Sequence, residues 1–241
     1  MKNPGIPDRL HQLLPGVSRV YRNYDIQQKK WLTDHPQIRV RCGPGCGYCC
    51  NMSVRVNLLE AIMIRENAGE RGVAKAVKAG KRILDFARGY HGSEAGYFYA
   101  FRLMLKRCSF LARGDRCLIH PFRPLSCREI LSGLPGRYCG AEAMENSTAI
   151  ALRRQRYRLP AGIFRGSPFV FPLIEAGHSF EKQLDARLTD ELGLSIRGEM
   201  NFLLRLLDQD EFARLLGKGI PGEICAFFEQ NQYPRVLVEV T

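Results

Sequence analysis

The sequence of 241 residues contains no long apolar run. A helix that spans a bilayer needs roughly 20 consecutive apolar residues, whereas the best candidate, residues 169–174, is short and contains Pro172. The first 16 residues hold Lys2, Asp8, Arg9 and three prolines instead of the apolar stretch of a signal peptide. These absences predict a cytoplasmic protein with no membrane span.

Several catalytic and cofactor motifs are also missing. The chain has no glycine-rich phosphate loop and no nucleophile elbow of the known forms. Histidine is scarce, and four of the five histidines are scattered without a pair at metal-binding spacing, namely His11, His35, His91 and His178. The fifth, His120, lies beside the later cysteines, where it serves either as a nitrogen ligand or as a hydrogen-bonded packing residue. We favour the packing role.

The chain is strongly basic, with a formal net charge of +12. Residues 1–158 contain 28 Lys and Arg against 12 Asp and Glu, while residues 159–241 contain 8 against 12. Such an asymmetry indicates a surface that meets phosphate, an acidic partner or a membrane face. It equally indicates compensation for buried anions, which cysteine thiolates would supply.

Cysteine is abundant, and eight of the nine cysteines lie between positions 42 and 139. In a reducing cytosol such a cluster predicts metal ligands or catalytic thiols, whereas disulfides are typical of secreted chains. The ninth, Cys225, has Ile224 and Ala226 as neighbours. We expect it to be a buried apolar side chain without a metal role.

The strongest motif is the run of Cys42, Cys46, Cys49 and Cys50 within nine residues. Two cysteines separated by two residues, as Cys46 and Cys49 are, can place both sulfurs about 2.3 Å from one ion. The glycines between them allow tight turns whose amides face the sulfurs. Because adjacent side chains point apart, Cys49 and Cys50 either serve two metals or one multi-iron cluster, or one of them only supports the site.

The remaining ligands must come from farther along the chain. The candidate metal ligands are Cys42, Cys46, Cys49, Cys50, Cys108, Cys117, Cys127 and Cys139. Eight sulfurs can form two four-sulfur sites, or one iron–sulfur cluster plus a zinc site, since tetrahedral thiolates suit zinc and iron alike. Ligands spread over about 100 residues also predict that the metal contributes to folding, so a structural metal competes with a catalytic one.

The later cysteines lie in a specific context, with His120-Pro121 followed by Arg123-Pro124 and then Cys127-Arg128. Together with the first cysteine loop, this pattern over residues 42–139 resembles the cysteine-cluster (CxxCxxCC) family of zinc- or iron-chelating proteins. Glu60 lies where such proteins often carry a glutamate. The resemblance implies a zinc or iron cofactor.

One feature departs from the family's name pattern, because three residues separate Cys42 from Cys46. This longer spacing is similar to a branch that includes flagellin lysine methylases, which depend on an iron–sulfur centre. That more distant resemblance implies a protein substrate, and S-adenosylmethionine as a cofactor only if the activity is shared.

Two groups of arginines have alternative roles. Arg123 and Arg128 either bind an anionic substrate or donate to cluster sulfurs, or else they balance thiolate charge and pair with Asp115 or Glu129; we favour the structural role. The basic run of Arg153, Arg154, Arg156 and Arg158 surrounds Tyr157. It either contacts nucleic acid, by gripping phosphate and stacking, or forms a solvated helix face, which we favour.

The periodicity predicts a mainly α protein with a few short strands. Helices are expected over 17–34, 58–67, 73–88, 94–106, 124–131, 147–157, 180–192, 196–207 and 211–216. Strands are expected over 53–56 and 235–240, with a hairpin over 108–119. We divide the chain into an N-terminal helical extension (1–41), a cysteine-cluster metal-binding domain (42–158) and a helical C-terminal region (159–241).

Three functions are consistent with these patterns. The leading hypothesis is a protein that binds zinc or iron, the latter also as an iron–sulfur cluster. The second is an iron–sulfur-dependent protein lysine methyltransferase or redox enzyme, with catalytic residues that the sequence does not identify. The third is a nucleic-acid-binding metal module.

Overall fold

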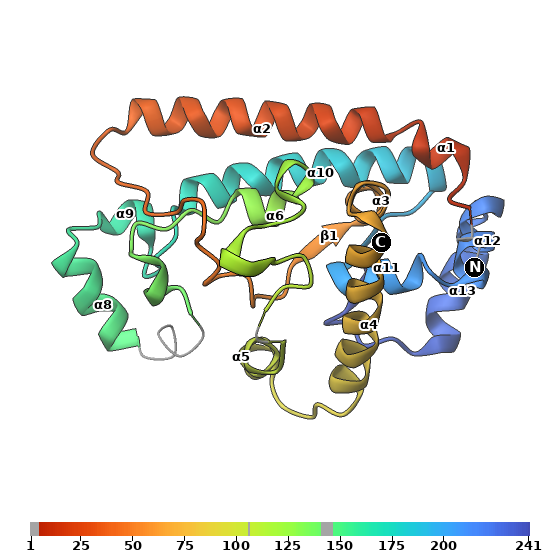
Figure 1. Cartoon of the computed structure of the whole chain (residues 1–241). Helices are drawn as coiled ribbons and strands as arrows, with labels where there is room; N and C mark the ends of the chain where they lie inside the picture. Colours follow the sequence, from red (N-terminus) through yellow and green to blue (C-terminus); the bar gives the residue numbers. More distant parts are fainter. Residues whose placement is uncertain (1–4, 106, 141–146) are drawn as a thin grey trace.

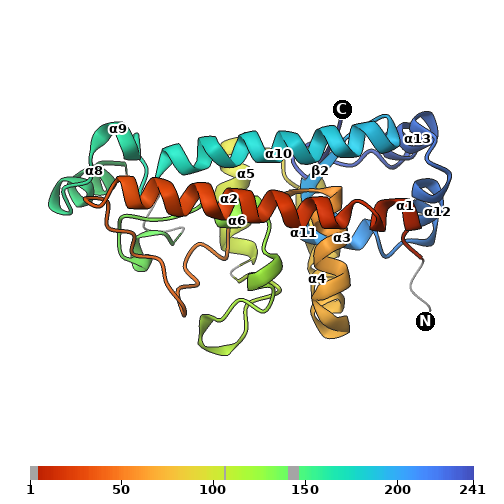
Figure 2. The ribbon, with the colours of Figure 1, turned by 90° about the horizontal axis from the view of Figure 1, so that it is seen from above.

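Two long helices lie side by side and form the main structural unit of the fold (Figures 1 and 2). The computed structural model describes residues 5–105, 107–140 and 147–241. Helix α2 (Leu14–Asp34) runs antiparallel to α10 (Phe171–Leu192), and the two helices are in contact. Helix α10 begins nine residues before the predicted start at 180. Pro172 is compatible with this early start because proline is well suited to the first turn of a helix.

Shorter helices surround this pair. Besides α2, the first half of the chain forms α1 (Asp8–His11), α3 (Leu58–Asn67), α4 (Gly69–Arg88) and α5 (Glu94–Leu105). The later helices are α6 (Leu125–Arg128), α8 (Ser147–Arg156), α9 (Ala161–Phe164), α11 (Met200–Leu206), α12 (Asp210–Lys218) and α13 (Pro221–Asn231). Three short 3-10 helices, η1 (Arg113–Asp115), η2 (His120–Phe122) and η3 (Gly136–Tyr138), lie in the cysteine-rich part. The predicted class, mainly α with a few short strands, is confirmed.

The strands form one small antiparallel sheet in the order β1-β2-β3. Strand β1 (Arg55–Asn57) pairs with β2 (Ile196–Glu199), which pairs with β3 (Val238–Val240). The predicted helix over 196–207 is therefore wrong in its first four residues. Helix α11 begins only at Met200, because residues 196–199 form strand β2. The Glu199 side chain accepts from the Phe202 amide and so serves as the N-cap of α11.

Helices α4 and α11 pack closely where a glycine removes the side chain between them. A Cβ at Gly80 would lie 2.3 Å from the carbonyl oxygen of Asn201. Only glycine permits this approach without a shift of one helix. This contact connects the middle of the chain to the C-terminal region.

A single large cluster of buried apolar side chains joins the three segments of the chain. It includes Val17 and Tyr24 from α2, Leu59 from α3 and Leu184 and Phe202 from the C-terminal region. A smaller cluster beside it contains Ile38, Phe164, Val170 and Leu173, with the partly buried Trp31 packed against them. In the described part of the chain, no helix has the length and apolar character needed to cross a membrane.

Candidate metal centre

The first cysteine loop folds against the segment that carries Cys108 and Cys117. The loop turns through Gly45, which has a φ of +81°, and Gly47 faces the side chains of Leu111 and Asp115 so closely that a Cβ there would lie 2.9 Å and 3.0 Å from them. Glycine is thus needed both for the turn and for the close packing. These contacts place the loop over the segment that carries Cys108 and Cys117.

Cys108 and Cys117 lie on the two arms of a short irregular hairpin. Leu111 and Cys117 form an isolated bridge, and the Leu118 amide donates to the Phe110 carbonyl over 2.9 Å. In each arm the thiol accepts a hydrogen bond from the backbone two residues later, from Phe110 to Cys108 and from Ile119 to Cys117. Such amide–sulfur bonds stabilise thiolate charge.

The third contributing segment is residues 132–139. The Ser132 amide donates to Cys42 Sγ over 3.2 Å, while the buried Cys139 thiol donates to Ser132 Oγ over 3.3 Å. Gly136 lies against the first loop, where a Cβ would be 2.8 Å from Cys46 Sγ. These contacts bring Cys42, Cys46 and Cys139 to one place.

The electrostatic interactions between thiols divide the eight candidate ligands into two groups. The charges of Cys108 and Cys127 raise the pKa of Cys50, those of Cys108 and Cys117 raise the pKa of Cys127, and those of Cys42 and Cys46 raise the pKa of Cys139. One group consists of Cys50, Cys108, Cys117 and Cys127, and the other of Cys42, Cys46 and Cys139. Cys49 lies between the groups, because its charge affects members of both.

Burial dominates the titration of most of these thiols. It raises the pKa of Cys108 to about 12 and that of Cys139 to about 11, and it raises the pKa of Cys127 well above its ordinary value. Cys49 is the exception, since a hydrogen bond from Cys50 lowers its pKa to about 7. Without a cation, burial keeps most of this centre protonated.

Two guanidinium groups compensate for sulfur charge. Arg123 lowers the pKa of Cys42, Cys49, Cys117 and Cys127. Arg102 also lowers the pKa of Cys49, and it donates to the Asn51 side chain and the Cys139 carbonyl. Sequence analysis missed Arg102, although a single basic residue within the apolar helix 94–105 was an available signal.

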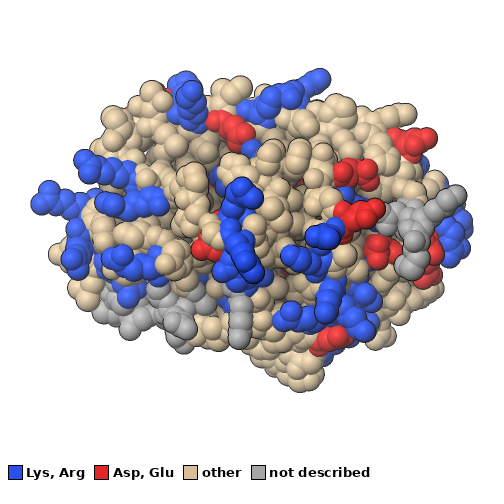
Figure 3. Space-filling view, in the orientation of Figure 1, with Lys and Arg blue, Asp and Glu red and all other residues tan. Residues whose placement is uncertain are grey.

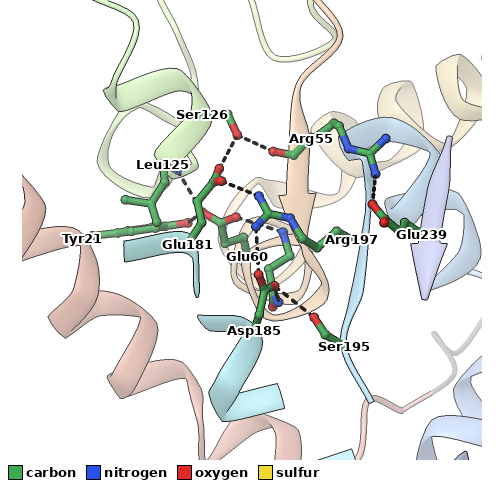
Figure 4. Close-up of polar contacts among 11 residues, drawn as sticks. Tyr21, Arg55, Glu60, Leu125, Ser126, Glu181, Asp185, Ser195, Arg197 and Glu239 are labelled. Carbon is green, nitrogen blue, oxygen red and sulfur yellow. Dashed lines mark hydrogen bonds and ion pairs between the residues drawn. The ribbon is translucent and has the colours of Figure 1, made fainter. Parts of the chain in front are cut away.

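The element that carries Cys127 is anchored by a buried carboxylate network (Figure 4). Glu60, which is fully buried, accepts from the Leu125 amide at the start of α6 over 2.9 Å and from the Tyr21 hydroxyl over 3.1 Å. Ser126 donates to Glu181 over 3.2 Å, and Glu181 pairs with Arg197 at 2.6 Å. Helices α2, α3 and α10 thereby fix the position of α6.

The other predicted residues lie apart from the sulfurs. Arg128 is buried and pairs with Asp25 at 2.6 Å over the ring of Tyr21, so its carboxylate partner is neither Asp115 nor Glu129. His120 is exposed in η2. Cys225 is only half-buried, although it packs against the core.

The basic run is split between several environments. Arg153 stacks on the ring of Tyr138 with its guanidinium carbon 4.7 Å from the centroid, whereas Arg156 and Arg158 line a pocket with Tyr157. Arg154 has a buried Nε without a hydrogen-bond partner. The four arginines therefore do not form one continuous face.

The donor set fits zinc or iron by its chemistry, since clustered thiols with amide and guanidinium donors are typical of both metals. Within residues 5–105, 107–140 and 147–241, however, no three His, Cys, Asp or Glu side chains are grouped so that they could hold one ion. The fold gathers the sulfurs in one region without converging them on a point.

Comparison with known families identifies this region. Residues 41–146 match the family model CxxCxxCC, described as "Putative zinc- or iron-chelating domain". The match includes every candidate ligand, so the cysteine-rich region is similar to this zinc- or iron-chelating domain; the rest of the chain lies outside the match. No curated protein and no solved structure matches the chain.

Proposed function

We propose that this protein holds two metal ions, zinc or iron, in two neighbouring four-thiolate sites. The first site consists of Cys50, Cys108, Cys117 and Cys127, and the second of Cys42, Cys46, Cys49 and Cys139. The observation that carries the proposal is the packing of the first cysteine loop against two cysteine-bearing segments, through Gly47 against Leu111 and Asp115 and through Cys42 and Cys46 against residues 132–136. Four thiolates per ion is the coordination number that structural zinc and mononuclear iron sites require.

The assignment of Cys49 rests on spacing. Cys46 and Cys49 have the separation at which two sulfurs reach one ion, and we assign Cys50 to the other site because the charges of Cys108 and Cys127 act on its thiol. Because Cys49 acts on thiols of both groups, we expect the two sites to be neighbours. With the amide donors of Phe110, Ile119 and Ser132, each site also has hydrogen bonds that tune its sulfurs.

The metals act mainly as structural crosslinks in this proposal. Each proposed site joins the loop 42–50 to a segment more than 50 residues away, namely 108–127 or 139. Metal binding to such a site is coupled to folding, because the unfolded chain has no preformed site. An iron–sulfur cluster that uses the same thiols would add redox or methyl-transfer chemistry.

The test is metal and sulfide analysis of protein purified without oxygen, combined with paired substitutions. We expect about two equivalents of metal per chain. Cys117→Ser and Cys46→Ser should each remove one equivalent, and the double variant should remove both. Cys117→Ser with Cys127→Ser should remove no more than either alone, because both belong to one site.

Other results would overturn this arrangement. Loss of all metal from every single variant would indicate one multinuclear cluster, and acid-labile sulfide with visible absorption would identify it as iron–sulfur. That result would justify activity assays with S-adenosylmethionine. Cys225→Ser is the matched control and should retain the full metal content.

A further inference from the structure

A second site lies at the end of the molecule where α8 and α9 meet the segment after α2. A pocket of about 420 Å³ opens there, and Figure 3 shows Lys and Arg side chains gathered at this end. Its lining includes Arg39, Arg41, Arg156 and Arg158, and no Asp or Glu among the described residues. A pocket of this size is typical of small-molecule sites.

The four arginines have no carboxylate partners among residues 5–105, 107–140 and 147–241. All four are exposed side chains, whereas the buried Arg128 pairs with Asp25. Arg41 is held in place, because its amide donates to the Ser132 carbonyl over 2.8 Å and its guanidinium lies 5.1 Å from the centre of the Tyr157 ring. Four cations without anions in one pocket favour a ligand that carries more than one negative charge.

Part of the pocket wall is apolar, where the half-buried Leu159 and Tyr157 lie among the arginines. Ile38 and Phe164 are buried in its wall, and Leu159 packs beside them. Gly133 is required there, since a Cβ would lie 2.7 Å from the Phe164 ring. An aromatic ring and apolar side chains bind a flat ring system, while arginine forks bind phosphate.

We propose that this pocket binds a nucleotide, with its base against Tyr157 and the apolar wall and its phosphate on the arginines. The site does not depend on the metal assignment. It differs from a nucleic-acid surface, because Arg153 is engaged with Tyr138 outside the pocket lining. A bounded pocket accommodates one nucleotide, whereas a strand needs a continuous groove.

The backbone at Arg158 supports a role for its side chain. Arg158 has a φ of +52° after the end of α8, a conformation in which glycine is the favoured residue. An arginine there costs conformational energy. Replacing it with glycine removes the guanidinium and also removes the backbone strain. Arg158→Gly should therefore weaken ligand binding without lowering the stability of the fold.

The test uses the full-length protein as purified and the fluorescence of Trp31, the single tryptophan of the chain, which packs against the apolar cluster of the pocket. AMP, adenosine and inorganic phosphate are titrated separately at constant ionic strength and pH, and calorimetry checks each affinity. We expect saturable binding of AMP, with adenosine and phosphate each at least about 10-fold weaker. Equal affinities for phosphate and AMP would overturn the nucleotide assignment.

The variants locate the site. Arg158→Gly and Arg41→Ala should each weaken AMP binding about 10-fold, and Arg158→Gly should melt at a temperature no lower than wild type. Lys75→Ala and Lys78→Ala on the exposed side of α4 remove equal charge and should leave the affinity within about twofold. Absence of saturable AMP binding, an equal loss in the lysine variants, or tighter binding of a single-stranded oligonucleotide than of AMP would overturn the proposal.

Discussion

The helical frame and the cysteine-rich region are built in different ways. The frame, formed by α2, α3, α4, α10 and α11, contains long helices whose buried side chains include Leu58, Ile62 and Leu203 at 0% exposure. From residue 108 to residue 139 the described chain has only helices of three or four residues. The comparison indicates that apolar burial along whole helices holds the frame, whereas the cysteine-rich region contributes single buried side chains such as Phe110 and Leu125 and depends more on glycine contacts and on its thiols.

Metal removal should produce the largest difference between the two regions. The amides of Phe110, Ile119 and Ser132 donate to sulfur, so after chelation we expect their hydrogen exchange to accelerate by about 100-fold or more. Amides in the frame, such as Ile64, should keep most of their protection. Residue-resolved exchange before and after chelation measures both; uniform loss throughout the chain would mean that the metals stabilise a single cooperative unit.

The same contrast explains which parts of the structure could be predicted. Asn57 and Glu60 identify the start of α3, and the structure confirms the capping box they form. The strand β2 was missed because its residues have a helical pattern and become extended only by pairing with β1 and β3. Helix α13 was also missed, although Pro221 at its first turn was a usable signal.

At the candidate site, the sequence names the candidate ligands but does not give their arrangement. The cysteines can be recognised as candidate ligands by their type and spacing. Their division between two groups depends on contacts that only the structure gives, such as Gly136 packed against Cys46 and Gly47 packed against the hairpin. Arg102 and Ser132 come from segments with no spacing signal relative to the cysteines. Long-range packing, absent from local pattern, decides these contacts.

Gly80→Ala tests the frame without touching the cysteines. The added methyl group would meet the Asn201 carbonyl at 2.3 Å, so α4 and α11 must separate. We expect a loss of about 2–3 kcal/mol in the free energy of unfolding, measured by urea denaturation, with metal content unchanged. Gly217→Ala in α12 is the matched control, because no atom lies within 4 Å of its Cβ; it should be neutral or stabilising by up to about 1 kcal/mol.

Loss of metal from Gly80→Ala would contradict the separation of the two regions. It would show that the position of α4 controls the sulfurs, through α5 and its Arg102. An unchanged stability would instead indicate that the two helices can move apart at little cost. Either result is read from the same denaturation and metal analysis.

Glu60 joins the two regions, and its titration gives the smallest expected effect. Burial raises its pKa from 4.5 to about 7, which means that the folded protein favours the neutral acid. Its stabilising contribution is therefore complete below pH 4.5, is lost as the pH rises to about 7, and changes no further above that. Glu60→Gln cannot ionise, so relative to this variant the wild type should lose about 1–2 kcal/mol of unfolding free energy between pH 5 and 7.5.

Urea denaturation of the metal-loaded proteins at several pH values measures this difference, and subtraction of the variant removes the pH dependence of the metal sites. Glu229→Gln, at an exposed position on α13, should retain the wild-type profile. An identical decline in Glu60→Gln would assign the pH dependence to another group. A flat profile in that variant would assign the decline to ionisation of the buried Glu60, whose charge is costly to bury at the junction of α3 and α6.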